Sequence, residues 1–377
     1  MEWKPLTECC NILDGKRKPI TKGARQSGPY PYYGANGIQD WVADYIFDGT
    51  YVLIGEDGSV ITPNGTPIVN WAHGKIWVNN HAHIIAEKTG VLLRFLFYYI
   101  QIIDIHNLVH GNIPKLTQGD LKELEIPVPP LPVQEEIVRI LDTFTELQAE
   151  LQAELQKRLQ QYNYYRDNLL SFDGRTDVEW KKLGEIATEW YRGAGIKRDE
   201  VSEEGYPCIR YGEIHTTYNI WFDECVSHTD ESQQPARKYA DYGDILFAIT
   251  SEDIPFVGNS VAYLGKERIL VGGDIVVMKH TQDPKYMSYV LSTSDAVKQK
   301  GKGKVKSKVV HTNVPSLQEI VVPLPSLEEQ KRIASTLDKF YSLLNDLTSG
   351  LPAEIEKRKQ QYEYYRDKLL TFKRITK

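Results

Sequence analysis

A tyrosine-rich string occurs twice in this chain. It reads QQYNYYRDNLLSF at residues 160–172 and QQYEYYRDKLLTF at residues 360–372. Over the longer windows 156–172 and 356–372, 12 of 17 residues are identical. An internal repeat is the first feature to follow, because it predicts how the whole chain is organised.

The similarity extends well beyond this string. MEWKPLTE at 1–8 matches VEWKKLGE at 178–185. DLKELEIPVPPLPVQEEIVRILDTF at 120–144 matches SLQEIVVPLPSLEEQKRIASTLDKF at 316–340, at a constant offset of 196. The repeat therefore predicts a globular segment, a helical segment, a second globular segment and a second helical segment.

Each helical segment follows a cluster of prolines, which a helix from upstream cannot cross. Apolar residues then recur mostly at steps of three and four, the period of an α-helix. The pattern predicts a helix over about 133–170 and a second copy that is broken at SGLP, residues 349–352. Because one long helix cannot bury its apolar stripe alone, we expect the two copies to pair as an antiparallel coiled coil.

The segments before each helical region are typical of mixed α/β structure. Strand-like runs lie at 49–59, 74–86, 243–250 and 272–279, and short helices are expected near 94–101 and 285–292. We therefore expect an α+β fold with a pseudo-two-fold repeat. Its parts are a first globular domain (1–125), a first helical region (126–177), a second globular domain (178–315) and a second helical region (316–377).

The composition favours a cytoplasmic protein with no membrane association. No apolar run approaches the ~20 residues that a membrane span needs. The four cysteines have no paired or metal-ligand spacing, which is typical of a reducing compartment. The net charge is −6, but residues 14–25 hold five basic residues and one acid, and residues 295–308 hold six lysines and one acid. These local basic patches matter more for binding than the total charge.

The two tyrosine-rich strings agree on every side of the helix, although pairing between helices constrains only one stripe. Either the duplication is recent, or a common protein partner binds both copies. The second alternative predicts partner docking through two equivalent sets of residues: Tyr162, Tyr165, Arg166 and Leu169, and Tyr362, Tyr365, Arg366 and Leu369.

Three features together resemble the specificity (S) subunit of type I restriction–modification enzymes over essentially the whole chain. They are the proline-rich entry into EEQKRIASTLDKF (328–340), the ending GLPAEIEKRKQQYEYYRDKLLTF (350–372), and their partial copies at 127–172. In that family each globular segment is a target recognition domain that reads half of a split DNA sequence. The helices fix the separation of the halves and dock two methyltransferase subunits, and restriction subunits join this core. The resemblance thus implies double-stranded DNA and both kinds of subunit as partners.

DNA binding needs cations for phosphates and forked or amide side chains for base edges. The predicted phosphate contacts are Lys16, Arg17, Lys18, Lys22 and Arg25 in the first half, and Lys197, Arg198, Lys302, Lys304 and Lys306 in the second. The predicted base contacts are Asn36, Arg210 and Tyr211, and Tyr32 of the aromatic segment 30–37 is predicted to stack or wedge at DNA. The alternatives are that the lysine run at 298–308 is a solvated surface loop, and that the tyrosines of YPYYGANG (30–37) belong to the core.

Motifs for catalysis are missing from the sequence. No GxxxxGK[ST] string is present, no proline precedes an aspartate as in the commonest nuclease core, and no His spacing fits a metal site. SEDIPF (251–256) only partly resembles the catalytic loop of amino-methyltransferases, and no methyl-donor loop accompanies it. We therefore expect no catalytic residues, no cofactor and no metal. The alternatives are a non-catalytic coiled-coil scaffold that binds proteins through its two globular halves, and a self-contained methyltransferase. Retention on heparin, lost with salt, distinguishes DNA binding from the scaffold.

The first helical region differs from the second in one place. It lacks GLPAEI and instead contains TELQAELQAELQ at 145–156, three tetrapeptide units of strong helix formers. The units are either simple helical filler or a ruler whose length sets a distance.

Overall fold

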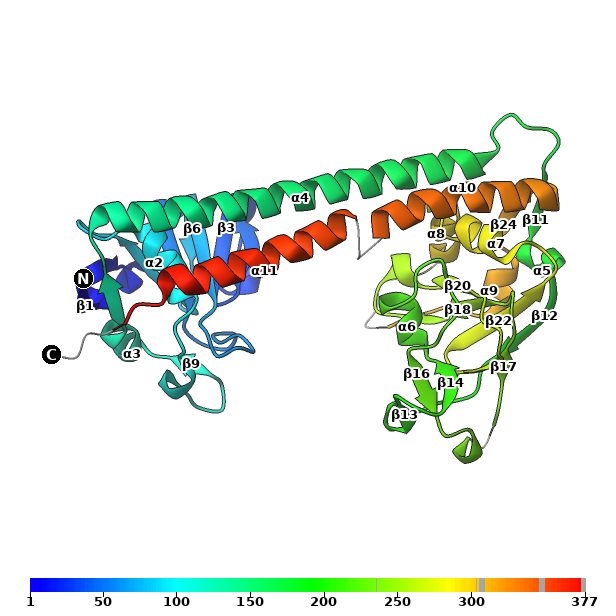
Figure 1. The fold of residues 1–377 in the computed structure, drawn as a ribbon, viewed down its shortest axis with the longest axis horizontal. Helices are drawn as coiled ribbons and strands as arrows, with labels where there is room; N and C mark the ends of the chain where they lie inside the picture. Colours follow the sequence, from blue (N-terminus) through cyan, green and yellow to red (C-terminus); the bar gives the residue numbers. More distant parts are fainter. Residues whose placement is uncertain (235, 303, 305–308, 346–349, 374–377) are drawn as a thin grey trace. The chain divides into compact units, whose positions relative to one another are not determined.

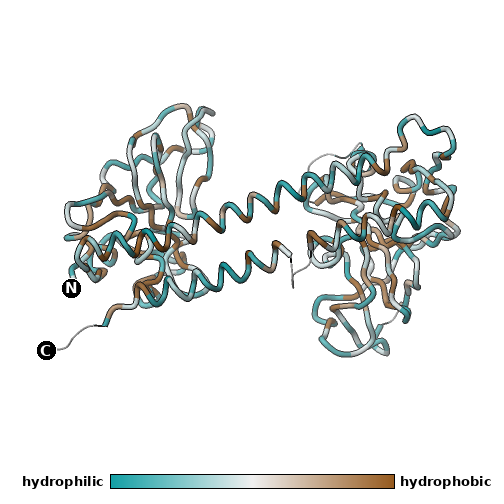
Figure 2. The backbone as a smooth tube through the Cα atoms, turned by 45° about the horizontal axis from the view of Figure 1, so that its top comes forward, coloured by the Kyte–Doolittle hydropathy of each residue, from teal (hydrophilic) through white to brown (hydrophobic). Residues whose placement is uncertain are grey.

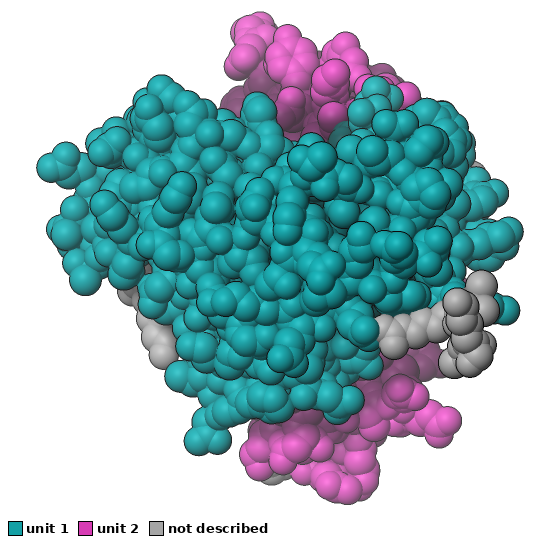
Figure 3. Space-filling model, turned by 90° about the vertical axis from the view of Figure 1, so that its left-hand side faces the viewer, with its two compact units in different colours: residues 1–152, 354–377 teal, residues 153–353 magenta. Residues whose placement is uncertain are grey.

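The computed structural model describes residues 1–234, 236–302, 304, 309–345 and 350–373. The chain folds into two compact units: Met1–Gln152 with Glu354–Lys377 (unit 1), and Ala153–Ala353 (unit 2). Figure 3 colours the two units separately. Each unit combines one globular segment with stretches of long helix, so the predicted α+β fold class is confirmed (Figure 1).

Unit 1 is built on a six-stranded sheet of order β2-β7-β5-β6-β3-β4. Its strands are mostly antiparallel, and β3 and β6 are parallel. Alternate residues of β5 point to opposite faces, so Val52 and Ile54 pack towards helix α2 while Leu53 packs on the other face. The strands and helices of this globular part are β1 (Glu2–Pro5), α1 (Leu6–Cys9), β2 (Cys10–Ile12), β3 (Ser27–Gly34), β4 (Gly37–Val42), β5 (Phe47–Gly55), β6 (Val69–Val78), β7 (Ala82–Glu87), α2 (Leu93–Ile100), β8 (Val109–His110), β9 (Lys115–Leu116), α3 (Gln118–Glu123) and β10 (Glu125–Val128).

Unit 2 contains two five-stranded sheets, of order β12-β22-β18-β20-β15 and β13-β16-β14-β21-β17. One face of the first sheet packs against helix α7, and the other closes on the second sheet. Its elements are β11 (Glu179–Lys182), α5 (Leu183–Ile186), β12 (Ala187–Arg192), β13 (Val201–Ser202), β14 (Tyr206–Ile209), α6 (Tyr211–Thr216), β15 (Trp221–Phe222), β16 (Ser227–Thr229), β17 (Tyr239–Ala240), β18 (Ile245–Ala248), β19 (Thr250–Ser251), β20 (Ser260–Tyr263), β21 (Ile269–Val271), β22 (Ile275–His280), α7 (Pro284–Leu291), α8 (Ser294–Gly301), β23 (Val310–His311), α9 (Val314–Gln318) and β24 (Val321–Leu324).

Two expectations about local structure are corrected. The run 74–86, predicted as one strand, contains the end of β6, a turn and β7, and β5 lies between these two strands in the sheet. The turn forms where the Asn79 side chain accepts a hydrogen bond of 2.8 Å from the His81 backbone N–H. The lysine-rich run from 298, predicted as a loop, begins inside helix α8.

The long helices are α4 (Leu131–Ser171), α10 (Leu327–Asn345) and α11 (Leu351–Leu370). Figure 2 shows hydrophobic and hydrophilic residues alternating along α4, as expected of a helix with one buried stripe. The predicted pairing is confirmed, with α4 contacting two partner helices. In unit 1 Phe144 of α4 stacks on Tyr365 of α11, with ring centroids 5.5 Å apart. In unit 2 Tyr162 of α4 packs against Tyr341 of α10.

None of the helices in the described ranges is both long and apolar enough to cross a membrane.

The two units attach their sheets to their helices through the same pair of contacts. The first is a buried glutamine in the opening turn of the long helix. Gln134 accepts a hydrogen bond of 2.9 Å from the Leu92 N–H, and Gln330, 196 residues later, accepts one of 3.0 Å from the Asp283 N–H. Both glutamines also donate to the carbonyl of the proline five residues earlier, so their amide groups are satisfied on both sides.

The second contact is an aspartate two turns further along the helix. Asp142 accepts hydrogen bonds from the Tyr98 hydroxyl at 2.5 Å and from Arg94 at 2.7 Å. Asp338, again 196 residues later, accepts from the Tyr289 hydroxyl at 2.7 Å and from the lysine of α7 at 2.6 Å. Each globular part is therefore fixed to its own long helix by equivalent glutamine and aspartate contacts.

Candidate nucleic-acid interface

The basic segment of unit 1, residues 15–25, belongs to the connection between β2 and β3. This connection contains two single-turn 3-10 helices, Asp14–Lys16 and Lys22–Ala24. Lys16, Lys18 and Lys22 are exposed, and so is Asn36 in the turn between β3 and β4. These four predicted contacts are free to meet a DNA backbone or base.

Arg17 belongs instead to the interior of unit 1. Its guanidinium donates to the Glu56 carboxylate at 2.5 Å and to the Ala82 carbonyl at 2.8 Å, and it lies 3.4 Å from Asp14. The side chain is only 12% exposed. The predicted phosphate contact at Arg17 therefore does not fit its position, because two carboxylates already neutralise it.

Asp14, Glu56 and His83 form a cluster whose ligand atoms lie within 4.8 Å of one another. His83 Nδ1 lies 2.6 Å from an Asp14 carboxylate oxygen, and Nε2 lies 2.9 Å from the Leu116 carbonyl oxygen. Burial raises the pKa of Asp14, but the hydrogen bonds from His83 and the Ile84 N–H and the charges of His83 and Arg17 together lower it further, so the pKa lies below its ordinary value. With both imidazole nitrogens engaged and Arg17 inside the cluster, this geometry is that of a charge network rather than a metal site.

Arg25 and Tyr32 are also held inside unit 1. Arg25 pairs with Asp40 at 3.1 Å, and its guanidinium carbon lies 4.1 Å from the centre of the Tyr32 ring. Tyr32 is 1% exposed, and its hydroxyl accepts a hydrogen bond from the Ile20 N–H. Tyr32 thus lies in the core, the alternative considered for this segment, and is not placed to contact a base. Trp41, which the sequence did not single out, is 52% exposed on the edge strand β4.

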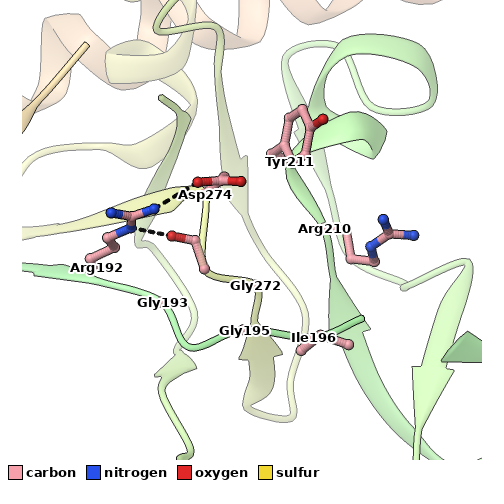
Figure 4. Close-up of a pocket in the computed structure, with 9 residues that line it drawn as sticks. Arg192, Gly193, Gly195, Ile196, Arg210, Tyr211, Gly272 and Asp274 are labelled. Atoms are coloured by element: carbon pink, nitrogen blue, oxygen red, sulfur yellow. Dashed lines mark hydrogen bonds and ion pairs between the residues drawn. The ribbon is translucent and has the colours of Figure 1, made fainter. Parts of the chain in front are cut away.

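In unit 2 the predicted residues Arg210 and Tyr211 line one pocket, with a volume of about 520 Å³ (Figure 4). The opposite side is formed by Arg192, whose guanidinium lies 2.7 Å from the Asp274 carboxylate and also donates to the Gly273 carbonyl. Arg192 was missed by sequence reasoning, because its position opposite Arg210 depends on sheet pairing. Lys197 and Arg198 are exposed nearby in sequence, and Lys197 lies 3.3 Å from Glu200.

The lysine run of unit 2 is divided between interior and surface. Lys300 is buried at the end of α8, where its ammonium donates to the Leu291 carbonyl at 2.8 Å. Burial lowers the pKa of Lys300 to about 7. Lys302 is exposed and Lys304 is half-buried. Lys306 lies outside the described residues.

The predicted docking residues likewise include both buried and exposed side chains. Tyr162 and Arg166 are buried in unit 2, where the guanidinium lies over the Tyr162 ring and pairs with Asp167 at 2.7 Å. Their counterparts Tyr362 and Arg366 are half-buried in unit 1.

The leucines of the predicted docking sets, Leu169 and Leu369, pack against the cores of their units. The exposed members are Tyr165 and Tyr365, at 52% and 37%.

Tyr164 and Tyr364, outside the predicted set, are more exposed still, at 65% and 60%. Each makes an edge contact with the tyrosine that follows it, at centroid distances of 5.6 and 5.3 Å. The Tyr164–Tyr165 pair and the Tyr364–Tyr365 pair thus present the same exposed aromatic surface from two helices. We call them the paired-tyrosine faces.

Two repeated helical regions and two unlike globular parts that carry exposed cations are the features of a protein that binds two different ligands from one repeated scaffold. The family model described as the type I restriction modification DNA specificity domain matches residues 1–161 and 176–357. The chain therefore belongs to the type I restriction–modification DNA specificity family, and the resemblance seen in the sequence is confirmed. Members of this family recognise DNA and assemble with other subunits of the system.

Several relatives are similar over most of the chain. A putative type I restriction enzyme specificity subunit of Haemophilus influenzae is 36% identical, covering 99% of this chain and 96% of its own. The EcoR124I/EcoR124II specificity subunit of Escherichia coli is 33% identical, covering 76% of this chain and 72% of its own. A solved S subunit from M. genitalium covers 100% of this chain and 96% of its own, with a TM-score of 0.53 at 16% identity, which supports the shared fold.

Proposed function

We propose that this protein gives a type I complex its DNA address without catalysing a reaction itself. Each globular part reads one half of a bipartite, asymmetric DNA site in the cytoplasm. Residues 1–125 and 178–315 serve as the target recognition domains, and residues 126–177 and 316–377 serve as spacer and docking regions.

The observation that carries this proposal is that the two globular parts are attached to their long helices by equivalent contacts but contain different sheets. The attachments, Gln134 with Asp142 and Gln330 with Asp338, are equivalent at an offset of 196 residues. The sheets that they hold are different, since unit 1 has one six-stranded sheet and unit 2 has two five-stranded sheets. Two different sheets that are attached to their helices by equivalent contacts suit a protein that reads two different DNA half-sites in a fixed geometry.

Phosphate contacts follow from the exposed cations. Lys16, Lys18 and Lys22 serve the first half-site, while Lys197, Arg198 and Lys302 serve the second. Such contacts set the register on the duplex and contribute affinity that falls with salt. Base recognition then comes from side chains such as Asn36 and Arg210.

The paired-tyrosine faces dock two methyltransferase subunits, and restriction subunits join that core. Exposed aromatic side chains that recur in an equivalent setting fit a partner present in two copies. In unit 2 the face continues into a hollow of about 670 Å³, where Tyr165 lies with Phe340 and Leu343 of α10. Leu343 is 72% exposed, so this hollow offers an apolar surface to the partner.

A methyl-transfer assay tests the proposal. The purified chain alone should transfer no labelled methyl group to DNA, whereas the chain reconstituted with a type I methyltransferase subunit should direct methylation to one two-part site. Methyl transfer by the single chain would overturn the non-catalytic role. A chain that neither binds DNA nor changes the specificity of that methyltransferase would leave the protein-binding scaffold as the better account.

A further inference from the structure

Arg210 differs from most arginines in the described part of the chain. All the others except Arg198 are engaged by carboxylates, carbonyls or aromatic rings, as Arg17, Arg25 and Arg192 illustrate. The guanidinium of Arg210 makes no hydrogen bond or ion pair with another described residue, and the same is true of Arg198. An arginine whose donors are all unused can bind a ligand without first breaking an internal bond.

The backbone beneath this free side chain is rigid. Arg210 follows β14, whose Cys208 and Ile209 are fully buried and pair in parallel with β21. It precedes α6, where the Glu213 carboxylate accepts a hydrogen bond of 3.1 Å from the Arg210 N–H. The other oxygen of that carboxylate accepts from the Ser227 hydroxyl at 2.6 Å, so both Glu213 oxygens are engaged and neither pairs with the Arg210 guanidinium.

The pocket next to Arg210 is open to the close approach of a ligand. Figure 4 shows Arg192 with Asp274 on one side, and Arg210 and Tyr211 on the other. Several of the residues that line it are glycines, and a side-chain carbon added at Gly195 would meet nothing within 4 Å. Because Asp274 neutralises Arg192, Arg210 supplies the uncompensated positive charge of this pocket.

We propose that Arg210 is a specificity-determining residue that reads a guanine in the half-site bound by unit 2. This inference rests on the proposed DNA-reading function and names one of its contacts. The parallel N–H donors of a guanidinium match the O6 and N7 acceptors of guanine in the major groove. The planar guanidinium holds its donors in a fixed fork, which a lysine ammonium lacks, and the rigid strand–helix junction fixes where the side chain begins.

The test compares three proteins, each reconstituted with the methyltransferase: wild type, Arg210→Lys and the control Arg237→Lys, an exposed arginine of unit 2 with no assigned role in DNA binding. The recognised site is first mapped from the wild-type complex. Duplexes are then made in which each base pair of both half-sites is replaced in turn, and affinities are measured by competition at constant salt. Thermal unfolding of each chain serves as the folding control, and we expect no change for Arg210→Lys because its guanidinium makes no internal bond.

At one G·C position the wild-type complex should prefer the native pair by roughly 10- to 100-fold. Arg210→Lys keeps the charge but loses the fork, so the preference should disappear at that position alone, while affinity for unrelated DNA and the salt dependence stay the same. Arg237→Lys should leave the whole pattern unchanged.

Three outcomes would overturn the inference. In the first, the base pair whose preference changes is not a G·C pair. In the second, the preference changes at no single position. In the third, Arg210→Lys weakens binding equally on every sequence, as loss of a phosphate contact would. Failure of the wild-type complex to prefer any sequence is a separate result, because it would overturn the proposed function itself.

Discussion

Arg17 and Lys16 are neighbours in the basic segment, yet the fold uses them differently. Arg17 is tied to Glu56 and Asp14 inside unit 1, whereas Lys16 is exposed. Which cation is internal depends on where the carboxylates of distant strands lie. The charge pattern of residues 15–25 therefore located a basic surface without identifying its free members.

Arg17→Ala should lower the free energy of unfolding by about 3 kcal/mol, because it removes the guanidinium that pairs with two largely buried carboxylates, Asp14 and Glu56. Lys16→Ala, the matched control, should leave stability within about 0.5 kcal/mol and instead weaken DNA binding on all sequences alike. Chemical denaturation and DNA titration measure the two effects. If Arg17→Ala kept full stability and lost DNA affinity, the assignment of Arg17 to the interior would be wrong.

Lys300 gives stability a specific dependence on pH. Its ammonium is buried against two neutral groups, the Leu291 carbonyl and the Ser260 hydroxyl. The pKa is about 7 in the fold and has an ordinary value of 10.5 when unfolded. Between these values the unfolded chain binds more protons than the folded chain, so this lysine makes stability rise with pH.

Lys300→Met should flatten that rise, by at most about 1.4 kcal/mol per pH unit between pH 7 and pH 10. Lys298→Met, an exposed position on the same helix, should keep the wild-type slope. Unfolding followed by tryptophan fluorescence across this range provides the measurement. Parallel curves for wild type and Lys300→Met would show that the buried ammonium does not titrate in this window.

At the scale of elements, the helices could be predicted from the sequence and most of the side-chain partners could not. The 3.6-residue period and the proline clusters are local signals, and α4 begins and ends within two residues of the predicted helix. The burial of Lys300 depends on how α8 packs beside α7, and the division of 74–86 depends on β5 lying between β6 and β7. Such contacts join residues far apart in the chain, where no local pattern marks them.

The burial of several predicted docking residues changes which substitutions can test docking. Charge reversal at Arg166 would disturb unit 2 itself, so a sharper test uses the exposed Tyr164 and Tyr364. Changing both to alanine should weaken assembly with the methyltransferase by about 10-fold or more and leave thermal stability unchanged.

The control for this test is a double change at Asn163 and Glu363, both to alanine, which are exposed positions on the same helices. Light scattering of the mixed subunits reports assembly. Normal assembly by the Tyr164/Tyr364 variant would favour recent duplication as the reason for the repeat.

The tetrapeptide units at 145–156 make a prediction about length. Helix α4 is continuous through them, and the boundary between the two compact units falls there, after Gln152. Deleting Ala149–Gln152 removes about 6 Å of helix and turns its far end by about 40°. One base pair of DNA rises ~3.4 Å and turns roughly 35°. The deletion should therefore shorten the gap between the half-sites by one base pair, or at most two.

Mapping methylated sites in cells that carry each length variant checks this ruler. Glu150→Gln with Gln152→Ala changes the same exposed stretch without changing its length, and should preserve the gap. An unchanged gap after the deletion, or altered half-sites, would identify the units as filler.

At the scale of the whole molecule, the chain carries two similar helical regions and two different globular parts. Membership of the family indicates that the protein recognises DNA. The two different sheets, attached to their helices by equivalent contacts, are the reason to expect two different half-sites. We expect an asymmetric site because the side chains offered by the two units are not the same. Asn36 is exposed in unit 1, whereas Arg210 lines a pocket in unit 2.

Single-molecule sequencing of DNA from cells that express this chain with its methyltransferase tests this central claim most directly. The account predicts methylation at one motif made of two unlike specific parts, separated by a gap of fixed length and unspecified sequence. Cells that express the methyltransferase without this chain should lack that motif. A single uninterrupted motif, two identical half-sites, or the same motif in the absence of this chain would contradict the account.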